Sequence, residues 1–271
     1  MNISIVVPVY NTPADLLVSC VESVYEEAYI ASVDVDLIIV DDFSDFHESI
    51  FILDFLAAKY PLRFLRNKQN LGVIYSRYAG MMLAKCQFVL FHDSDDRLIP
   101  NALLHLKQCL NNLPTFVFGL LPSTTFQLSS LPSSFYLNPM TLDRLLLATY
   151  NTGELSLLIN LVNYRVIFAR SPSPFLFFLR RHEFASLIKH AFICRNQATA
   201  VLFDFHFRSY ESATHSQGLS VTRFSPRNCH LMSLGHIISS YYLFRLGRLT
   251  YSISFFFRSL FYLLISLFSL K

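Results

Sequence analysis

The chain begins with short apolar runs separated by longer stretches in which apolar residues recur at helical spacing. The short runs, many of them β-branched, predict five strands, at residues 3–9, 33–40, 62–65, 87–91 and 115–118. The longer stretches predict four helices, one starting behind Thr12, Pro13 and Asp15, one over about 45–58, one within "NLGVIYSRYAGMMLAKC", and one from Pro100 to about 112. For the first helix, Thr12 is the predicted N-cap and Pro13 the predicted first helical residue. This alternation of strand and helix predicts a mostly parallel sheet covered by helices.

Polar residues follow several of the predicted strands. The segment "PVYN" ends the first strand, Asp41 and Asp42 end the second, and "HDSDD" ends the fourth. The carboxyl ends of parallel strands meet at one edge of a sheet, and open α/β proteins bind their ligands there. We therefore expect these three segments to line a common site.

Three acids, Asp93, Asp95 and Asp96, lie within four positions of one another after the fourth strand. A solvated turn would account for them, because Asp and Ser favour turns. A divalent cation would also account for them, because hard cations collect oxygen ligands. The position of the acids at the shared edge of the sheet favours the cation.

The sequence lacks the signature motifs of other nucleotide-binding folds. The turn after the first strand, "PVYNTP", contains no glycine, so the Rossmann fingerprint is absent, and no GxxxxGK[ST] segment indicates a P-loop. Phosphatases with an aspartyl nucleophile carry their DxD after the first strand, whereas here it follows the fourth. A sugar-phosphate nucleotidyltransferase would have a glycine-rich basic loop after the first strand, and that loop is missing.

Composition points to a reducing compartment and to contact with lipid or a partner. The net charge of +3 in 271 residues is too small to indicate a nucleic-acid partner. Charged residues make up 15%, below the roughly 25% of typical soluble domains, and mean hydropathy is +0.40 with 27 phenylalanines. Five dispersed cysteines and an opening "MNISIVVPVY" without signal-peptide features predict a cytoplasmic protein.

The tail of the chain carries a narrow polar stripe. Arg245, Ser252, Ser259 and Ser266 recur every seven residues, and Phe, Leu and Ile fill most of the remaining positions. A spanning helix would place Arg258 near the bilayer centre, at a cost of roughly 2.5–3.5 kcal/mol, and would leave the stripe without a role. An amphipathic helix lying in the membrane surface is therefore the favoured interpretation, and a helix docked on a protein partner is the alternative.

Taken in order, the quoted segments resemble the inverting family 2 glycosyltransferases with a GT-A type fold. The matching stretches are "ISIVVPVYNTPADLLVSCVESV", "VDLIIVDDFSD" and "NKQNLGVIYSRYAGMMLAKCQFVLFHDSDD", with looser matches at "LINLVNYRVIFARS", "RRHEFASLIKHAF" and "FRSYESATHS". The resemblance implies a Rossmann-like α/β domain over residues 1–120 that binds a nucleotide-sugar. Residues 121–232 would then form the acceptor-binding and catalytic-base region, and residues 233–271 the membrane-associating tail.

The resemblance also implies donor-binding roles for five residues. Pro8 and Tyr10 would flank the nucleotide base, and Asp42 would hydrogen-bond it. Gly72 would approach the donor, although a turn before a helix is an equally good reason for this glycine. Arg77, on the first turns of the following helix, would contact the diphosphate. The alternatives are core packing for Tyr10 and a surface cation for Arg77.

For the acidic cluster, the resemblance implies that Asp93 lies near the ribose and that Asp95 binds Mg²⁺ or Mn²⁺, with Asp93 as the second candidate metal ligand. These cations prefer one or two carboxylates together with phosphate oxygens. Asp96 would orient either Arg97 or a metal-bound water.

Glu183 is the predicted general base for the acceptor hydroxyl. It begins the run "EFASLIKHAF", which resembles the acidic-pair helix of the family, with His182 and Glu183 in place of the usual acidic pair and Lys189 as the usual basic residue. The other acids of the acceptor region are Asp143, Glu154, Asp204 and Glu211.

The expected function is transfer of a sugar, with inversion, from a nucleotide diphosphate-sugar, with UDP favoured by the resemblance, to a glycan or lipid-linked acceptor. The setting would be synthesis of cell-surface polysaccharide or lipooligosaccharide at the inner face of the cell membrane. Two alternatives remain open: a degenerate module that binds a nucleotide-sugar without turnover, and a sugar-phosphate nucleotidyltransferase.

Overall fold

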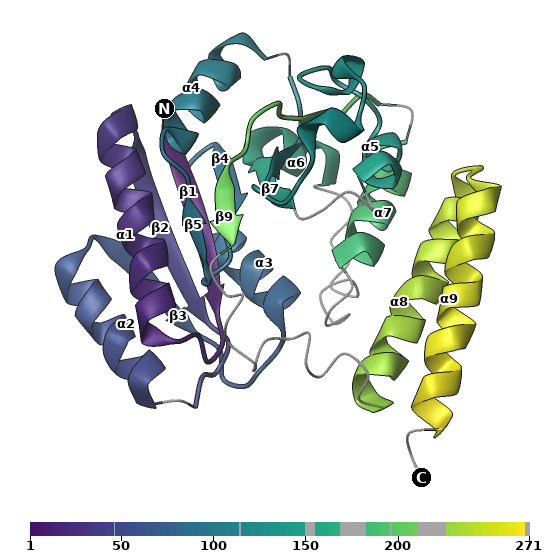
Figure 1. Cartoon of the computed structure of the whole chain (residues 1–271), viewed down its shortest axis with the longest axis horizontal. Coiled ribbons are helices and arrows are strands. Elements are labelled where there is room, and N and C mark those ends of the chain that lie inside the picture. Colours follow the sequence, from purple (N-terminus) through teal and green to yellow (C-terminus); the bar gives the residue numbers. More distant parts are fainter. Residues whose placement is uncertain are drawn as a thin grey trace.

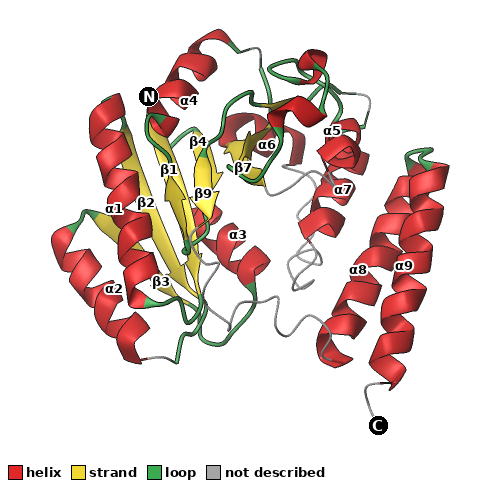
Figure 2. Ribbon diagram, viewed as in Figure 1, coloured by secondary structure: helices red, strands yellow, loops and turns green. Residues whose placement is uncertain are grey.

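A seven-stranded sheet forms the centre of the protein in this computed structural model (Figures 1 and 2). The structure describes residues 1–45, 47–113, 115–149, 155–168, 183–195, 197–210 and 226–268. In sheet order the strands are β3 (Leu62–Arg66), β2 (Asp34–Asp41), β1 (Asn2–Val9), β4 (Phe88–Phe91), β7 (Leu155–Asn160), β6 (Phe118–Pro122) and β8 (Ala200–Leu202). Strands β1 to β4 are parallel, β6 and β8 are parallel, and β7 is antiparallel to both of its neighbours. The predicted mostly parallel α/β fold is confirmed.

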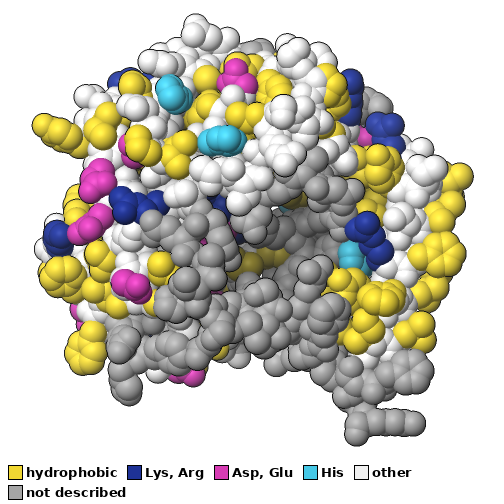
Figure 3. Space-filling model, viewed as in Figure 1, with side chains coloured by type: hydrophobic (Ala, Val, Ile, Leu, Met, Phe, Trp, Pro, Cys, Tyr) yellow, Lys and Arg dark blue, Asp and Glu magenta, His cyan; other side chains and the backbone are white. Residues whose placement is uncertain are grey.

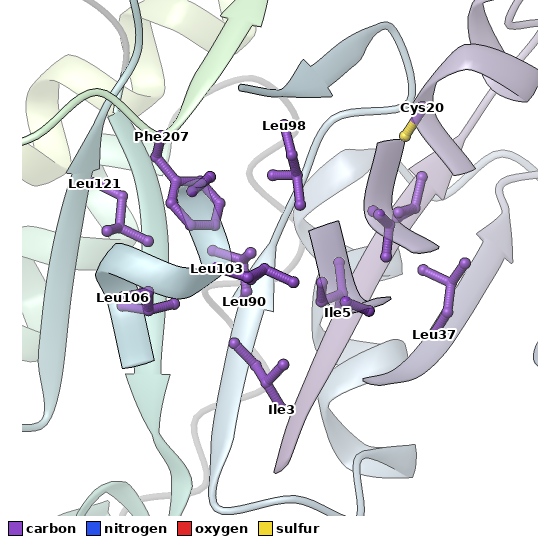
Figure 4. Close-up of a cluster of buried hydrophobic side chains, with 14 of the residues drawn as sticks. Ile3, Ile5, Cys20, Leu37, Leu90, Leu98, Leu103, Leu106, Leu121 and Phe207 are labelled. Carbon is purple, nitrogen blue, oxygen red and sulfur yellow. The ribbon is translucent and has the colours of Figure 1, made fainter. Parts of the chain in front are cut away.

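Helices cover both faces of the sheet and bury two hydrophobic cores. On one face lie α1 (Ala14–Ala31), α2 (His47–Lys59) and α4 (Ala102–Asn112), and on the other lie α3 (Val73–Leu83), α5 (Leu142–Thr149) and α7 (Glu183–Ile193). Successive residues of a strand point to opposite faces, so Ile5 and Val7 enter the first core while Val6 enters the second. Figure 4 shows the first core, in which Ile3, Ile5 and Leu37 of the sheet meet Leu103 and Leu106 of α4.

Two details of the predicted elements are wrong. The strand expected at 115–118 is β6, which starts only at Phe118, because its ladder partners on β7 and β8 begin there. Pro13 is the N-cap of α1 and no side chain caps the helix. The hydroxyl of Thr12, the predicted cap, is instead 2.7 Å from the hydroxyl of Ser94. This buried bond ties the start of α1 to the acidic segment.

A small second sheet connects the acidic segment to the second half of the chain. Strand β5 (Asp96–Leu98) pairs antiparallel with β9 (Arg208–Tyr210). Between β6 and β9 the chain forms two short 3₁₀ helices, η1 (Leu128–Ser130) and η2 (Ser133–Phe135), and the helix α6 (Leu161–Phe168). The β5–β9 pair brings residues more than a hundred positions apart to one edge of the central sheet.

The tail forms an antiparallel pair of helices, α8 (Pro226–Arg245) and α9 (Leu249–Phe268), beside α7 (Figure 1). The pair turns at Gly247, whose φ of 74° suits glycine. Ser259 and Ser252 of the predicted stripe are buried against α8, where their hydroxyls lie 3.0 Å and 3.1 Å from those of Ser233 and Ser240. The stripe therefore serves a contact between two helices, which is not the role that the sequence predicted for it.

Candidate functional site

Three loops meet at the carboxyl ends of β1, β2 and β4. Val9 pairs with Asp41 at the last position of the β1–β2 ladder. The next amide, that of Asp42, donates to the carbonyl of Val9 at 2.7 Å. On the other side of β1, the amide of His92 donates to the carbonyl of Val6 at 3.0 Å. The predicted segments "PVYN", Asp41–Asp42 and "HDSDD" therefore share one edge of the sheet.

Asp42 organises the loop that precedes α3. One carboxylate oxygen accepts hydrogen bonds from the Asn67 side chain and the Leu71 amide, each at 2.8 Å, and the other accepts from the Gly72 amide at 2.6 Å. Gly72 has a φ of 94°, a backbone conformation that L residues rarely adopt. The positive φ explains why a glycine occupies position 72, and the hydrogen bond places the Gly72 amide directly beside Asp42.

Arg77 projects from α3 toward the acidic segment and forms an ion pair with Asp93. Its guanidinium lies 5.9 Å from the centre of the Phe91 ring. Burial would raise the pKa of the Asp93 carboxyl, but the charges of Arg77 and Arg208 outweigh this effect and hold the pKa below its usual range. The predicted alternative of a solvated surface cation does not describe Arg77, whose side chain is 16% exposed.

Arg208, on β9, was not among the residues predicted from the sequence. Its side chain is 4% exposed and forms an ion pair with the buried Asp96, and one of its nitrogens lies 3.6 Å from Asp93. Arg97, one of the two groups that the sequence analysis gave Asp96 to orient, approaches Glu26 at 3.6 Å. Two arginines from separate parts of the chain therefore compensate the charges of Asp93 and Asp96.

Asp95 lies on the turn between these two acids and is partly exposed. Among the described residues, no group of three or more His, Cys, Asp or Glu side chains forms a complete metal cage. Mg²⁺ and Mn²⁺ do not require one where phosphate oxygens complete the shell, since one or two carboxylates suffice. Asp95, with Asp93 beside it, fits that pattern.

His92, the first residue of the segment, is completely buried. Burial, together with the charge of Arg208, lowers the pKa of His92 to about 3. Its imidazole is therefore neutral at physiological pH and adds no charge to the acidic cluster.

Pro8 and Tyr10 lie at the end of β1, where the sequence placed the nucleotide base. Pro8 is buried within the strand, whereas Tyr10 is 49% exposed. This exposure excludes the alternative that Tyr10 is a packed core aromatic. Its ring is accessible at the edge where the three loops meet.

Phe43 also presents an exposed ring at this edge, and it was not predicted. It follows Asp42, is 45% exposed and has a φ of 67°. The left-handed conformation costs an L residue about 1–2 kcal/mol. The guanidinium of Arg66 lies 5.5 Å from the ring centre, but an exposed cation–π contact contributes only about 0.5–1 kcal/mol. The contact does not fully offset the backbone cost.

The predicted base, Glu183, is the first residue of α7, so the predicted helix is confirmed. The side chain of Glu183 lies outside the described residues, as do Glu154 and Glu211. Asp143 is buried and paired with Arg248 at 2.8 Å, which makes it unavailable as a base. Lys189 is partly buried, and burial lowers the pKa of its ammonium group.

Comparison with known proteins identifies the family of the N-terminal half. The sequence model of glycosyl transferase family 2 matches residues 4–128. Residues 4–128 are therefore similar in sequence to glycosyl transferase family 2. The resemblance drawn from the quoted motifs is thereby confirmed for the part of the chain that carries the β1–β4 edge.

Curated glycosyltransferases are similar to part of the chain. The chain is 31% identical over 106 residues to the glycosyltransferase GlyG of Streptococcus pneumoniae, covering 39% of this chain and 34% of that protein. It is 31% identical over 99 residues to the uncharacterized glycosyltransferase YibD of Escherichia coli, covering 36% and 27%. The matches thus span only about a third of the length of these relatives.

Two solved structures share the GT-A type fold over nearly the whole chain. S. aureus TarS in complex with UDP-GlcNAc superposes with a TM-score of 0.62 at 17% identity, covering 92% of this chain and 72% of that one. A mannosyltransferase from Pyrobaculum calidifontis in complex with GDP-Man and Mn²⁺ superposes with a TM-score of 0.63 at 14% identity, covering 99% and 73%. At these identities the likeness concerns the fold alone.

Proposed function

We propose that this protein is a glycosyltransferase that moves a sugar from a nucleotide diphosphate-sugar, a UDP-sugar, to a glycan or lipid-linked acceptor in the synthesis of a cell-surface glycan. The observation that carries the proposal is the acidic segment at the shared edge of β1, β2 and β4. There Arg77 and Arg208 compensate Asp93 and Asp96, and Asp95 lies on the turn between these acids, partly exposed. The family 2 match over residues 4–128, and the structural neighbours in complex with UDP-GlcNAc and GDP-Man, support the donor class.

The donor would bind along this edge with its base at the ends of β1 and β2. Tyr10 would contact the base, Asp42 would hold the Leu71–Gly72 turn beneath it, and Arg77 would face the diphosphate. Asp95, with Asp93, would hold Mg²⁺ or Mn²⁺. When bound, such a cation neutralises charge that develops on the departing diphosphate.

Transfer would proceed with inversion, as is general in family 2. A single displacement requires that the acceptor hydroxyl lose its proton as the diphosphate leaves. The acids of the donor edge cannot serve, because the base must approach from the opposite face of the sugar. Glu183, at the start of α7, is the proposed base.

The protein would act at the cytoplasmic face of a membrane, with α9 in contact with lipid. α9 is the helix among the described residues that is long and apolar enough to cross a membrane by length and composition, over Leu249–Ser266. The described tail, residues 226–268, contains no Asp or Glu and carries four arginines, at positions 227, 245, 248 and 258. Its positive charge complements an anionic lipid surface.

A screen of nucleotide-sugars with the full chain tests the function. We expect release of the nucleoside diphosphate from one donor class in the presence of Mn²⁺ and loss of release in EDTA. Binding without release would indicate the degenerate binding module. Release of pyrophosphate from a nucleoside triphosphate and a sugar phosphate would indicate a nucleotidyltransferase.

A further inference from the structure

Phe43 lies directly across the strand ends from Tyr10. The residues on either side of Tyr10 are hydrogen-bonded to the residues on either side of Phe43: the carbonyl of Val9 to the amide of Asp42 at 2.7 Å, and the amide of Asn11 to the hydroxyl of Ser44 at 2.9 Å. Both rings are about half exposed, at 49% and 45%. The hydrogen-bonded ends of β1 and β2 therefore each present one accessible aromatic side chain.

The loop that holds Phe43 is fixed from both sides. Asp41 accepts a hydrogen bond from the Ser44 amide at 2.9 Å and pairs with Arg66 at 3.0 Å. Arg66 also donates to the carbonyl of Ser44 at 2.7 Å. The side-chain amide of Asn11 donates to the Asp45 carboxylate at 2.6 Å, and its side-chain oxygen accepts from the Asp45 amide at 3.0 Å.

These bonds explain how a bulky residue stays in the left-handed region, with a φ of 67°. Strained residues persist where the surroundings over-determine them, and they cluster at ligand sites. Neither the cation–π contact with Arg66 nor burial accounts for an aromatic residue at this position, since nearly half of its surface remains exposed. A role toward a ligand accounts for both the strain and the exposure.

We propose that Phe43 is a nucleobase-binding residue: the base of the donor stacks on its ring, across from Tyr10. The inference rests on the proposed function, because it assumes a nucleotide donor at this edge. Stacking on an aromatic ring tolerates every base, since each has a π face. Phe43 would therefore contribute affinity for the nucleotide without selecting the base.

The test measures binding of UDP and of GDP, each with Mn²⁺, by calorimetry on the full chain. Its variants are Phe43→Tyr, which keeps the ring, Phe43→Leu, which keeps the apolar bulk and the strain, and Phe43→Gly, which removes both. We expect Phe43→Tyr to bind like the wild type. We expect Phe43→Leu and Phe43→Gly to lose about 5- to 150-fold in affinity for any nucleotide that the wild type binds.

Two controls separate stacking from other effects. Pyrophosphate with Mn²⁺ lacks a base, so its affinity should be the same in all Phe43 variants. Tyr29→Leu, at a residue near the C-terminal end of α1 that is 87% exposed, should leave nucleotide binding unchanged. Thermal melts should show Phe43→Gly to be folded, because glycine is at ease with a positive φ.

The proposal is overturned if Phe43→Leu and Phe43→Gly bind nucleotide as tightly as the wild type, or if pyrophosphate affinity falls in parallel with nucleotide affinity. A wild type that binds no nucleotide would overturn the proposed function itself. The two failures are therefore distinguishable in one set of titrations.

Discussion

At the scale of single residues, the acids of "DSDD" have different surroundings although they are neighbours in sequence. Asp96 is buried in an ion pair with Arg208, and Asp93 lies between Arg77 and Arg208. Asp95 lies on the turn between these two acids and is partly exposed. A substitution at Asp96 would remove the buried partner of Arg208 and would disturb the fold, so the metal-binding hypothesis is best tested at Asp95.

Asp95→Asn should keep the fold and abolish metal-dependent donor binding. Amide oxygen is a much weaker ligand for Mg²⁺ and Mn²⁺ than carboxylate, so the gain in UDP affinity on adding Mn²⁺ should fall by about 10- to 100-fold or more. Calorimetry with and without EDTA measures this gain. Asp15→Asn, at an exposed acid of α1, is the matched control. UDP binding that neither EDTA nor Asp95→Asn changes would contradict the metal site.

Glu183→Gln should reduce sugar transfer by about 10²- to 10⁴-fold, the usual contribution of a general base. Donor affinity should stay near that of the wild type, because the base acts on the acceptor. Initial rates of transfer and UDP calorimetry on the same preparation separate the two effects. Near-normal transfer by Glu183→Gln, with loss of transfer in Asp204→Asn or Glu154→Gln, would move the role to the residue that failed.

The sequence predicted the residues of this site that follow strands, and it missed those that reach the site by another route. Asp42, Asp93 and Asp95 each end a recognisable apolar run. Arg208 comes from the short strand β9, which pairs only with β5, and nothing local indicates that pairing. Phe43 was missed for another reason, because a positive φ at a bulky residue results from surrounding hydrogen bonds and has no signature in the sequence.

At the scale of elements, α3 positions Arg77 by packing closely on the sheet. A Cβ added at Gly80 would overlap Val6 of β1 and lie 3.2 Å from Val40 of β2. The absence of a side chain at Gly80 therefore lets the helix approach, and that approach sets the position of Arg77 one turn earlier.

Gly80→Ala should lower the free energy of unfolding by about 1–3 kcal/mol, the usual cost of an overpacked core. It should also weaken nucleotide binding, because α3 must shift. Met82→Ala, on the same helix at a side chain that is 59% exposed, is the control. Thermal and denaturant unfolding measure the effect. If the clash is the cause, Gly80→Ala combined with Val6→Ala should recover nucleotide binding, and a double variant no better than Gly80→Ala would contradict this explanation.

The α8–α9 pair encloses His236, which stacks on Tyr262 with ring centres 5.4 Å apart. Burial, with a smaller effect of the Arg258 charge, lowers the pKa of His236 to about 4. Between the unfolded pKa of about 6.5 and this value, the unfolded state binds a proton that the folded state does not. Stability should therefore fall as the pH drops through this window, by up to about 1.4 kcal/mol per pH unit.

Denaturant unfolding at pH 7 and pH 5 checks this prediction. His236→Gln should lose less stability over the interval than the wild type, since it removes the titrating group. His105→Gln, at an exposed histidine of α4, should behave like the wild type. Equal pH dependence in the wild type and His236→Gln would show that His236 does not contribute.

At the scale of the whole molecule, the pattern of the first half predicted the sheet because each strand there continues along the chain into its own helix. The second half broke this regularity. The antiparallel strand β7 and the parallel strand β8 join the sheet from far along the chain, and long-range pairing of this kind leaves no periodic signal. The tail was predicted as one amphipathic helix, since a sequence does not show that its polar stripe meets a second helix.

Many apolar side chains are exposed along the α8–α9 pair, where a helix pair in water would expose polar ones (Figure 3). Exposed apolar residues form one row on α8, at Leu234, Ile237, Tyr241 and Phe244, and another on α9, at Leu249, Ile253, Phe256, Leu260 and Leu263. On both helices most residues of the exposed row come one position after a buried residue. Both exposed rows are therefore rotated from the buried face of their helix in the same direction. Because the helices are antiparallel, the two rows lie on the same side of the pair. Serine contacts inside and apolar rows outside are typical of helices packed in lipid.

Replacing Phe256, Phe257 and Phe261 of α9 by Gln should therefore release the protein from vesicles that contain phosphatidylglycerol. The three rings are 46%, 63% and 56% exposed, so the fold should tolerate the change, and nucleotide binding should persist because the donor edge is remote from α9. Removing this much apolar contact should weaken vesicle binding on the order of tenfold or more. Flotation with the wild type and the triple variant measures the effect.

The matched control replaces Phe51 and Phe55 of α2, which are 74% and 53% exposed, and should leave flotation unchanged. A second copy of the chain is the competing occupant of the apolar face. Size-exclusion chromatography distinguishes it, since a wild-type dimer that becomes a monomer in the triple variant would assign the face to self-association. If lipid covers the face, the wild type should float with anionic vesicles, and it should float less in high salt because salt screens its arginines. The triple variant should then have the same oligomeric state as the wild type.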